Sequence, residues 1–409
     1  MKVVRGLSRR DAPPGRAEEV AEIIKAVRGA GDSAVLELTE RFDHAELGPD
    51  ELQVDARELE ESVGVLEPPL VEALRTAIAN VRAVAEAQLR DPVEVEGAQG
   101  QRIDVAERPV ERAGVYVPGG RAPYLSTVVM GAVTARVAGV AQVAVCAPPG
   151  PGGKAHPAIL AACVLCGVSE VYRMGGAQAV AALAYGTESV GAVDVIVGPG
   201  NAWVTEAKRQ VFGTVGIDGL AGPSELVVIA GADADPEIVA LDLLAQAEHG
   251  PDSPVALIAL DERVLSSVVA AVERMAPQRP SVTEAELQVL RADDPRAALR
   301  AAEEFAPEHL QLIGAEVEGL AEQVTRAGCL FVGAGSGTAF GDYVAGSNHV
   351  LPTGGAARFQ SALSVSTFRR RMARVSLPGD APARLAPAGA ALARAEGFPV
   401  HAESMERRA

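Results

Sequence analysis

Residues 224–260 of the chain read SELVVIAGADADPEIVALDLLAQAEHGPDSPVALIAL, and they indicate the architecture more clearly than any other segment. The first seven residues, SELVVIA, are mostly apolar and β-branched, which is typical of a buried strand. DPEIVALDLLAQAEHG follows with the apolar spacing of a helix, and SPVALIAL returns to a strand. A strand, a helix and a second strand in succession predict a parallel sheet with a right-handed crossover.

The same alternation begins at about residue 114. The strand-like runs QVAVCAP, EVYRMGG and VDVIVGPG are each followed by a helix-like run, and DERVLSSVVAAVERMA follows SPVALIAL in the same way. The first hundred residues differ, because RAEEVAEIIKAVRGAG, DSAVLELTERFD and PPLVEALRTAIANVRAVAEAQL all show helical spacing. The pattern predicts an α/β protein with a largely parallel sheet, whose ligands bind beyond the carboxyl ends of the strands. The loops RMGGAQ, VGPGN and AGPSE are therefore the places where function is expected.

Composition bounds the size and the partners of the protein. The 409 residues correspond to two or three domains at about 150 residues each, and 48% of them are apolar, enough for sizeable cores. A net charge of −17 argues against nucleic acid and anionic membranes as partners. The opening MKVVRGLSRRDAPPGR lacks the apolar run of a signal peptide, and no uncharged apolar run reaches the roughly 18 residues of a membrane helix. We expect a cytoplasmic protein that acts on a small molecule.

Two familiar patterns do not carry function here. Cys163 and Cys166 form a C-x-x-C, but they lie mid-helix among apolar residues, where small buried side chains are the usual explanation. The four cysteines of so long a chain are not a disulfide framework. PPGPGGKAH resembles a phosphate-binding loop, but Pro148 replaces its first glycine and Ala155 its Ser or Thr. A bound nucleotide would lack the usual glycine signature.

The segment LAQAEHG contains a possible half of a metal site. Gln246 and His249 are three residues apart, so on a helix they project from one face. The alternative is that His249 only occupies the last helical turn before Gly250, where the helix dipole favours it. An amide oxygen and one imidazole are too few for a metal, so further ligands would have to come from elsewhere.

The segment APEHL contains two adjacent groups that can transfer protons. Glu308 and His309 have different unperturbed pKa values, which suits acid–base catalysis. The alternative is structural: Pro307 would begin a helix, and Glu308 would lie in its first turn, where a carboxylate is favourable.

Three more polar side chains lie near the end of the chain. GDYVAGSNHVLPTGG (341–355) carries Asp342 and His349 on a glycine-rich loop, which could also be a solvated surface loop. His401 lies close to the C-terminus, where disorder is the usual expectation, so it functions only if the tail docks onto something.

Taken together, the chain resembles the histidinol dehydrogenase family. Seven segments match in the family's order and at similar spacing: VYVPGGRAPY, GGAQAVAALAYGTE, VGPGNAWVTEAKR, AGPSEL, LLAQAEHG, APEHLQL and GDYVAGSNHVLPTGGAARFQSALSV. The resemblance covers nearly the whole chain, from LELTERFD to AEGFPVH. Leu125 and Ala362 stand where the family usually has Pro and Gly, but neither is a ligand or an acid–base position.

The resemblance implies an α/β fold of two Rossmann-like doubly wound domains with mostly parallel sheets and small helical extensions at both ends. We expect an N-terminal extension (1–20) and a discontinuous first domain with the metal and catalytic residues (21–112 and 225–365). A second domain on the NAD side (113–224) and a helical tail swapped between two subunits (366–409) complete the expected chain.

The resemblance also implies an activity, the oxidation of L-histidinol to L-histidine through histidinal in the last step of histidine biosynthesis. Its cofactors would be two NAD⁺ and one Zn²⁺ per subunit of a homodimer. His309 would be the general base, and Glu308 would activate the water that adds to the aldehyde. The implied metal ligands are Gln246, His249, Asp342 and, from the partner subunit, His401. Those four are implied to contact the substrate with Ser224, His309, His349 and Glu396, and NAD would contact Tyr116, Gln178 and Asn201.

Two alternatives stay open at this point. A relative with the same scaffold could oxidise another amino or sulfonated alcohol. A non-catalytic small-molecule binding protein could also have two α/β lobes and a cleft. The adjacent Glu308 and His309 and the absence of a signal peptide disfavour the binding protein, whereas the substrate range is not fixed by these residues.

Overall fold

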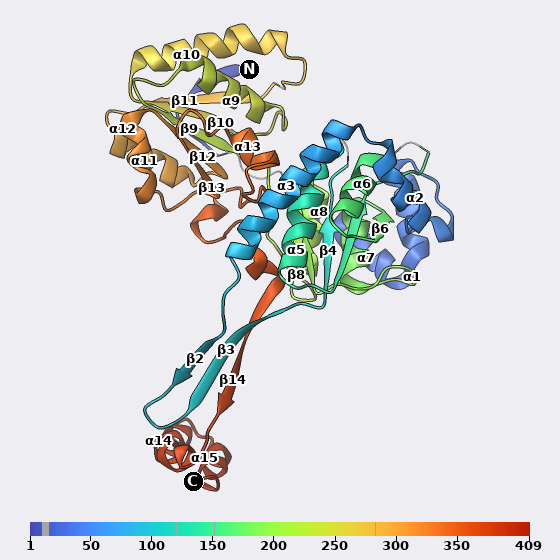
Figure 1. The fold of residues 1–409 in the computed structure, drawn as a ribbon, viewed down its shortest axis with the longest axis vertical. Helices are drawn as coiled ribbons and strands as arrows, with labels where there is room; N and C mark the ends of the chain where they lie inside the picture. The colour runs from blue at the N-terminus through green and yellow to red at the C-terminus, as the bar shows by residue number, and fades with distance from the viewer. Residues whose placement is uncertain (10–15, 120–121, 151, 283) are drawn as a thin grey trace.

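The computed structural model describes residues 1–9, 16–119, 122–150, 152–282 and 284–409. Part of the expected N-terminal extension, two residues of VYVPGGRAPY and one of PPGPGGKAH lie outside these ranges. The chain forms two α/β lobes and a narrow arm that ends in two helices (Figure 1). The expected α/β class with mostly parallel sheets is confirmed by the strand pairing.

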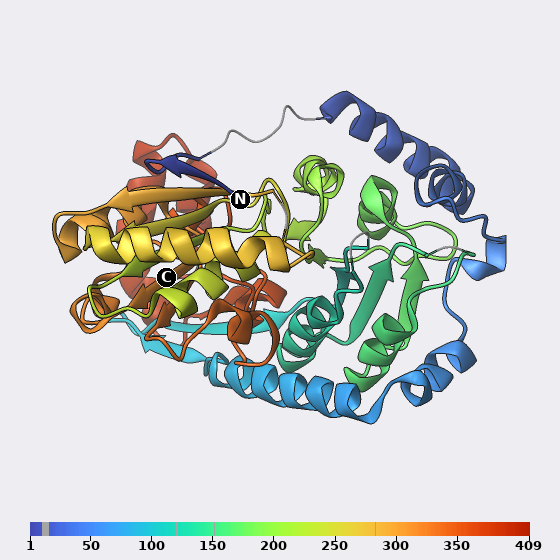
Figure 2. The same cartoon turned by 90° about the horizontal axis from the view of Figure 1, so that it is seen from above.

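The six-stranded lobe is built on a parallel sheet with the order β1-β11-β10-β9-β12-β13. Alternate residues of its strands face opposite sides, so α9 and α10 cover one face and α11 and α12 cover the other. This arrangement is doubly wound, as the repeated strand–helix pattern predicts (Figure 2). The elements are β1 (Lys2–Arg5), β9 (Leu226–Ala230), α9 (Pro236–Ala247), β10 (Val255–Ala259), α10 (Glu262–Met275), β11 (Glu286–Arg291), α11 (Pro295–Phe305), β12 (His309–Ile313), α12 (Ala315–Glu318), β13 (Cys329–Val332) and α13 (Thr338–Tyr343).

The five-stranded lobe has a second parallel sheet, with the order β6-β5-β4-β7-β8. One face is covered by α1, α7 and α8, and the other by α2, α3, α6 and the helical segment 125–137. The elements are α1 (Ala17–Asp43), α2 (Ala56–Ser62), α3 (Pro68–Ala87), β4 (Arg112–Tyr116), α4 (Leu125–Val128), the π-helical η3 (Val129–Val133), α5 (Thr134–Val137), β5 (Gln142–Ala147), α6 (Pro157–Leu165), β6 (Glu170–Arg173), α7 (Gly176–Tyr185), β7 (Val195–Val197), α8 (Ala202–Val211) and β8 (Gly216–Ile217).

The N-terminal helices pack on a different sheet from the one expected. The grouping of 21–112 with 225–365 is corrected, because the apolar faces of α1 and α3 are buried against the five-stranded sheet. The very N-terminus does the opposite, since β1 joins the edge of the six-stranded sheet beside β11. Helical spacing shows that a helix has a face to bury, but it does not show which sheet that face will cover.

The arm is a three-stranded antiparallel sheet in which β14 (Arg369–Ser376) pairs with β3 (Arg102–Pro109), and β3 pairs with β2 (Val93–Glu96). The tail therefore begins as a strand rather than as a helix. It continues into α14 (Ala381–Ala395) and α15 (Pro399–Glu406), which pack on each other through small side chains instead of being disordered. Short helical turns complete the chain at η1 (Pro49–Glu51), η2 (Val63–Val65), η4 (Ala276–Gln278), η5 (Ala321–Gln323), η6 (Ala356–Arg358) and η7 (Val365–Phe368).

Among the described helices, none is long and apolar enough to span a membrane.

Candidate active site

Glu308 and His309 lie at the amino end of β12, where the strand enters the six-stranded sheet. No helix begins at Pro307, so the structural alternative for this segment is wrong: α11 ends at Phe305, and Ala306 adopts a left-handed conformation. The run HLQLI then pairs with β9 on one side and β13 on the other, and this fixes it as a central strand. Both side chains are buried, with 6% of Glu308 and 2% of His309 exposed.

The Glu308 carboxylate is held through one of its two oxygens. Its Oε2 atom accepts hydrogen bonds from the Ser224 hydroxyl at 2.6 Å and from the Glu225 backbone N–H at 2.8 Å. Burial raises the pKa of Glu308 to about 7, although the neighbouring His309 and the two donors oppose the rise. A carboxyl that titrates near neutrality can both accept and return a proton.

His309 is oriented by a backbone carbonyl and two carboxylates. Its Nδ1 lies 2.9 Å from the Glu225 carbonyl oxygen and 3.5 Å from Glu308 Oε2, while its Nε2 lies 3.6 Å from Asp342 Oδ1. The carbonyl can only accept, so Nδ1 carries a proton and Nε2 is the nitrogen that can gain or lose one. Burial disfavours the charged ring, but the two carboxylates outweigh it and raise the pKa of His309 to about 9.

Gln246 and His249 lie at the carboxyl-terminal end of α9. The Gln246 amide donates to the Ser224 hydroxyl at 2.9 Å, which leaves its carbonyl oxygen for another partner. His249 lies in a turn just beyond the end of α9 rather than in its last helical turn, and its charge acts on both Asp342 and His349. The helix end therefore faces the loop that carries those two residues.

Asp342, in α13, links the possible metal ligands to His309. Burial would favour its neutral form, but His309, His349 and His249 outweigh burial and hold the pKa of Asp342 below 3.8. Within the described ranges, no cluster of three or more His, Cys, Asp or Glu side chains is close enough to hold a metal ion. The amide oxygen of Gln246, the imidazole of His249 and the carboxylate of Asp342 are nevertheless a donor set that suits zinc and lacks one ligand.

The loop 341–355 bridges the two lobes. His349 Nδ1 donates to the Asp342 carbonyl at 2.8 Å, and its Nε2 lies 3.3 Å from the Thr127 hydroxyl in the five-stranded lobe. Asn348 donates to the Met130 carbonyl in the π-helical turn at 3.2 Å. Burial lowers the pKa of His349. The loop is thus a packed connection between the lobes and not a solvated one.

The three residues expected to contact NAD lie at the carboxyl ends of strands in the five-stranded lobe. Tyr116 ends β4 and accepts from the Gly176 backbone N–H at 3.1 Å. Gln178 follows β6 in the first turn of α7, and Asn201 follows β7 and caps α8 by accepting from two backbone N–H groups. All three positions obey the crevice rule for parallel sheets.

Three further polar residues at the site were not predicted. Asp43 ends α1 and lies 3.4 Å from the Gln178 amide, and burial raises its pKa to about 6. Glu225 contacts both Glu308 and His309, and Thr127 contacts His349. Asp43 and Glu225 belong to the quoted segments LELTERFD and AGPSEL, so their acidic side chains were a usable signal, whereas Thr127 gave none.

The structure does not bring His401 and Glu396 to the other site residues of the same chain. Glu396 caps the end of α14 and His401 lies in α15, at the far end of the arm from both lobes (Figure 1). Both side chains are exposed, and the His401 ring lies 5.4 Å from that of Phe398.

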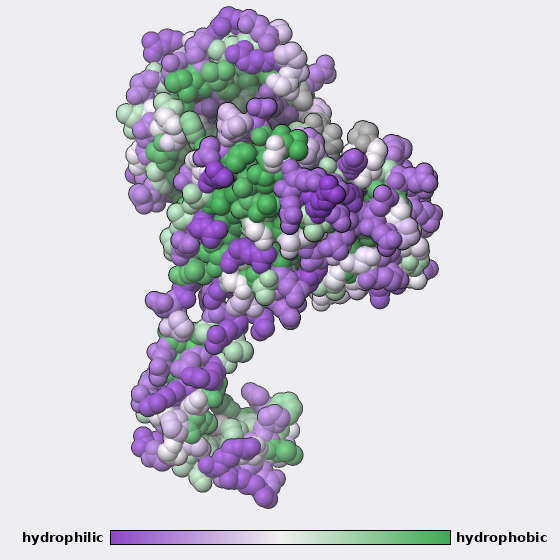
Figure 3. All heavy atoms as spheres, turned by 45° about the vertical axis from the view of Figure 1, so that its right-hand side comes forward, coloured by the Kyte–Doolittle hydropathy of each residue, from purple (hydrophilic) through white to green (hydrophobic). Residues whose placement is uncertain are grey.

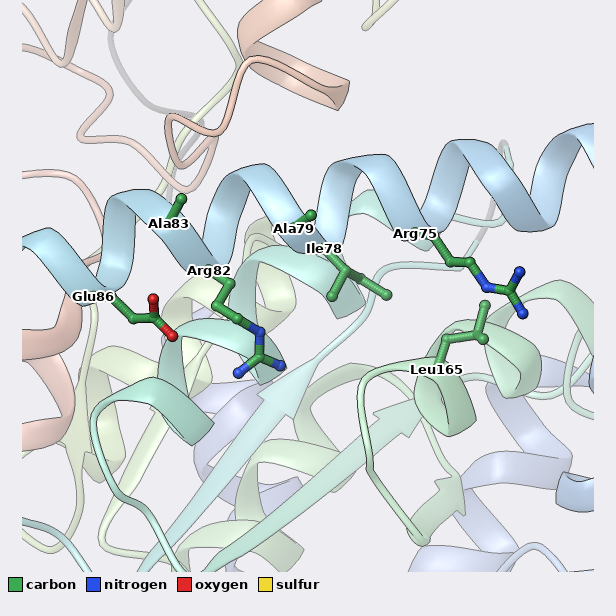
Figure 4. Close-up of a pocket in the computed structure, with 7 residues that line it drawn as sticks. All are labelled: Arg75, Ile78, Ala79, Arg82, Ala83, Glu86 and Leu165. Atoms are coloured by element: carbon green, nitrogen blue, oxygen red, sulfur yellow. The ribbon is translucent and has the colours of Figure 1, made fainter.

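A separate hollow of about 380 Å³ lies between α3 and α6 (Figure 4). It contains none of the residues described above. Its lining is Arg75, Ile78, Ala79, Arg82, Ala83, Glu86 and Leu165.

These features define a two-lobed α/β enzyme with a buried carboxylate–imidazole couple in one lobe and a possible dinucleotide edge on the other. Residues 9–409 match the family model described as histidinol dehydrogenase. The chain therefore belongs to the histidinol dehydrogenase family, whose members are NAD-dependent oxidoreductases.

Individual relatives agree with the family model. The chain is 47% identical over 392 residues to histidinol dehydrogenase of Parasynechococcus marenigrum, covering 94% of this chain and 89% of that one. It is 45% identical over 404 residues to the Synechococcus protein of that name, covering 97% and 93%. The crystal structure of histidinol dehydrogenase from Elizabethkingia anophelis superimposes with a TM-score of 0.94 at 32% identity, covering 100% of this chain and 98% of that one.

Proposed function

We propose that the chain oxidises L-histidinol to L-histidine in two steps through histidinal, with Glu308 and His309 as the catalytic couple. One observation carries this assignment: a buried carboxylate and a buried imidazole lie side by side, 3.5 Å apart, with Glu308 Oε2 held by two further donors and His309 Nδ1 by the Glu225 carbonyl. Residues kept dry and oriented in this way are suited to proton transfer.

His309 acts as the base in both hydride transfers through the neutral form of its ring, which becomes the major form above its pKa of about 9. Its Nε2 atom faces the space beside Asp342, where a substrate hydroxyl can approach. The base takes the hydroxyl proton while the hydride leaves carbon for NAD⁺, and it does so again when the hydrated aldehyde is oxidised. Because Glu225 and Glu308 hold the ring, no reorientation is needed between the two steps.

Glu308 activates the water that adds to the aldehyde between the two steps. Its pKa near 7 lets the carboxylate remove a proton from water at neutral pH. The hydroxyl of Ser224 stabilises the carboxylate and also orients the Gln246 amide, so it couples the catalytic residues to the metal ligands. His349 and, from a second copy of the chain, Glu396 hold the polar end of the substrate in this proposal.

We infer that Gln246, His249, Asp342 and His401 of a second copy of the chain would hold one zinc ion, which would bind the substrate's nitrogen atoms and so orient its reacting carbon. Tyr116, Gln178 and Asn201 contact NAD. These assignments rest on the family resemblance, and the donor set of the described residues supports them. A cytoplasmic location stays a prediction from the sequence.

The arm supports the proposal of a homodimer. The register pairs Val93 with Val105, and it places Ile103 between Val95 on one side and Val375 on the other. Five apolar side chains are thereby aligned on one face of the sheet. Val93 is 57% exposed and Val375 is 62% exposed. A single sheet with an open apolar face normally packs against another layer. Figure 3 shows apolar surface, drawn in green, on this narrow arm and also near the junction of the lobes.

The distance between the tail and the lobes makes the dimer testable. If His401 acts on the other subunit, a dimer of His309→Ala and His401→Ala chains contains one intact site. After equal mixing and reassortment, about a quarter of the wild-type activity returns, because about half of the dimers are mixed and each has one working site of two. The assay is NADH absorbance with L-histidinol, with and without a chelator. Mixed dimers that stay inactive would refute the shared site, and wild-type protein loaded with zinc that gives no NADH would refute the activity.

A further inference from the structure

Glu225 contacts the catalytic couple through each of its polar groups. Its backbone N–H donates to Glu308 Oε2 at 2.8 Å, and its carboxylate accepts from the Glu308 backbone N–H at 3.3 Å. Its carbonyl oxygen accepts from the His309 backbone N–H at 3.1 Å and lies 2.9 Å from His309 Nδ1. Only 2% of Glu225 is exposed, so a small movement of this residue displaces both members of the couple.

The buried charge of Glu225 needs a partner of opposite sign, and Arg9, whose side chain is 28% exposed, supplies it. Burial raises the pKa of the Glu225 carboxyl, and the Arg9 charge opposes that rise. Arg9 Nε lies 3.4 Å from Glu225 Oε1, and within the described ranges it is the one Lys or Arg side chain at ion-pair distance from this carboxylate. Removing one member of a buried pair leaves the other charge uncompensated, which is strongly unfavourable.

Arg9 also holds the segment that leads into the couple. Its guanidinium lies 4.5 Å from the centre of the Phe305 ring and donates to the Phe305 carbonyl and, at 3.4 Å, to the Ala306 carbonyl. These carbonyls end α11, where a cation is favoured, and they precede Glu308 by two or three residues. A single side chain therefore contacts both Glu225, which immediately precedes β9, and the end of α11, which leads into β12.

The backbone around Arg9 leaves room for this contact. Gly355 has a φ of +80°, and a Cβ atom built on it would lie 2.1 Å from Arg9 Nη1. The adjacent Gly354 donates its backbone N–H to Glu225 Oε1 at 3.2 Å. On the other side, the backbone of Ser8 exchanges two hydrogen bonds with the Gln288 side chain. These bonds anchor the N-terminal segment that carries Arg9.

We propose that Arg9 is a positioning residue of the reaction: through Glu225 it aligns the Glu308 carboxylate with the His309 ring. The Arg9 guanidinium faces Glu225 and the end of α11, so Arg9 acts on the reaction through Glu308 and His309. This inference rests on the catalytic roles proposed above for Glu308 and His309. It makes a short segment near the N-terminus part of the catalytic machinery, although that segment lies about 300 residues away in sequence from the couple.

The test compares Arg9→Met, Arg9→Lys and Arg5→Met in the full-length, zinc-loaded protein. Arg5 is an exposed arginine in β1, in the same N-terminal segment as Arg9, and is the matched control. We expect Arg9→Met to lower kcat about tenfold, which corresponds to about 1.4 kcal/mol, with KM for L-histidinol changed less than about twofold. Arg9→Lys recovers part of the loss, and Arg5→Met behaves like wild type.

A double-mutant cycle with Glu225→Gln separates positioning from general damage. The neutral amide no longer needs a cation, so adding Arg9→Met to Glu225→Gln should cost less than it costs in wild type. The inference fails if Arg9→Met leaves kcat unchanged, if only KM changes, or if the lost activity matches the unfolded fraction in a thermal melt. Glu308→Gln in the same assay tests the couple itself: full activity of that variant would refute the proposed roles, whatever Arg9 does.

Discussion

Replacing Glu308 by Gln should separate the two halves of the reaction. Both hydrogen bonds to the carboxylate converge on Oε2, from the Ser224 hydroxyl and the Glu225 backbone N–H. A glutamine can direct its carbonyl oxygen to these two donors and place its NH₂ group where Oε1 stood. The substitution therefore removes the base and its charge while the hydrogen bonds that hold the side chain remain.

The size of the effect follows from what is lost in each half. Addition of water to the aldehyde loses its general base, which is worth about 10²–10⁴-fold in rate. We therefore expect oxidation of supplied histidinal to fall by about 100-fold or more, or about 2.7 kcal/mol of transition-state stabilisation. Oxidation of the alcohol keeps His309 as its base. It also loses the carboxylate that raises the pKa of His309, so we expect it to fall by less than about tenfold.

The assay follows NADH after limiting L-histidinol is mixed with zinc-loaded enzyme. Wild type forms two NADH per substrate in one course, whereas the variant should form the first rapidly and the second slowly. Glu304→Gln, an exposed glutamate near the end of α11, is the matched control and should behave like wild type. If Glu308→Gln slows alcohol and aldehyde oxidation by the same factor, water activation by Glu308 is wrong.

Three further predictions test other parts of the site. Aldehyde oxidation should rise with pH in two steps, near 7 as Glu308 ionises and near 9 as His309 loses its proton, because burial raises the pKa of Glu308 to about 7 and the neighbouring carboxylates raise that of His309 to about 9; a rate that is flat between about pH 5.5 and 8.5 would contradict the role of Glu308. Ser224→Ala should weaken zinc binding about 10–100-fold, since the hydroxyl orients the Gln246 amide; competition with a chromophoric chelator measures it, and unchanged affinity would count against that role. His401→Ala should reduce bound zinc well below one per chain in elemental analysis, and a full complement would remove His401 from the ligand set.

The regular part of the fold was predictable because its signals are local. The segment 224–260 forms β9, α9 and β10 as expected, since continuous apolar runs and helical spacing lie within it. The strands of the arm were missed because VEVE and RRRMARVS are short, charged and exposed, and β14 finds its partner β3 more than 250 residues earlier. Neither segment shows by itself which distant strand it will pair with.

The site was only partly predictable for a different reason. Adjacent Glu308 and His309 were recognisable as chemistry, but their secondary structure depended on β9 and β13, which lie elsewhere in the sequence. The sequence did not point to Arg9 as a site residue, because an arginine in an N-terminal segment is usually solvated and its partner Glu225 is distant in sequence. In the proposed site His401 comes from a second copy of the chain, so the structure of one subunit does not contain the complete ligand set.

The two lobes present opposite ends of their sheets to the proposed site, and this explains how the ligands are divided. The five-stranded lobe obeys the crevice rule: Gln178 and Asn201 lie at the amino ends of α7 and α8, whose positive dipole ends suit the phosphates of a dinucleotide. The six-stranded lobe breaks that rule, because Glu308 precedes β12 and Gln246 lies at the carboxyl end of α9. The negative end of a helix, together with nearby carboxylates, suits a metal ion and a substrate that carries an amino group. In the proposed function, an anionic cofactor and a cationic substrate would therefore be matched to helix ends of opposite sign.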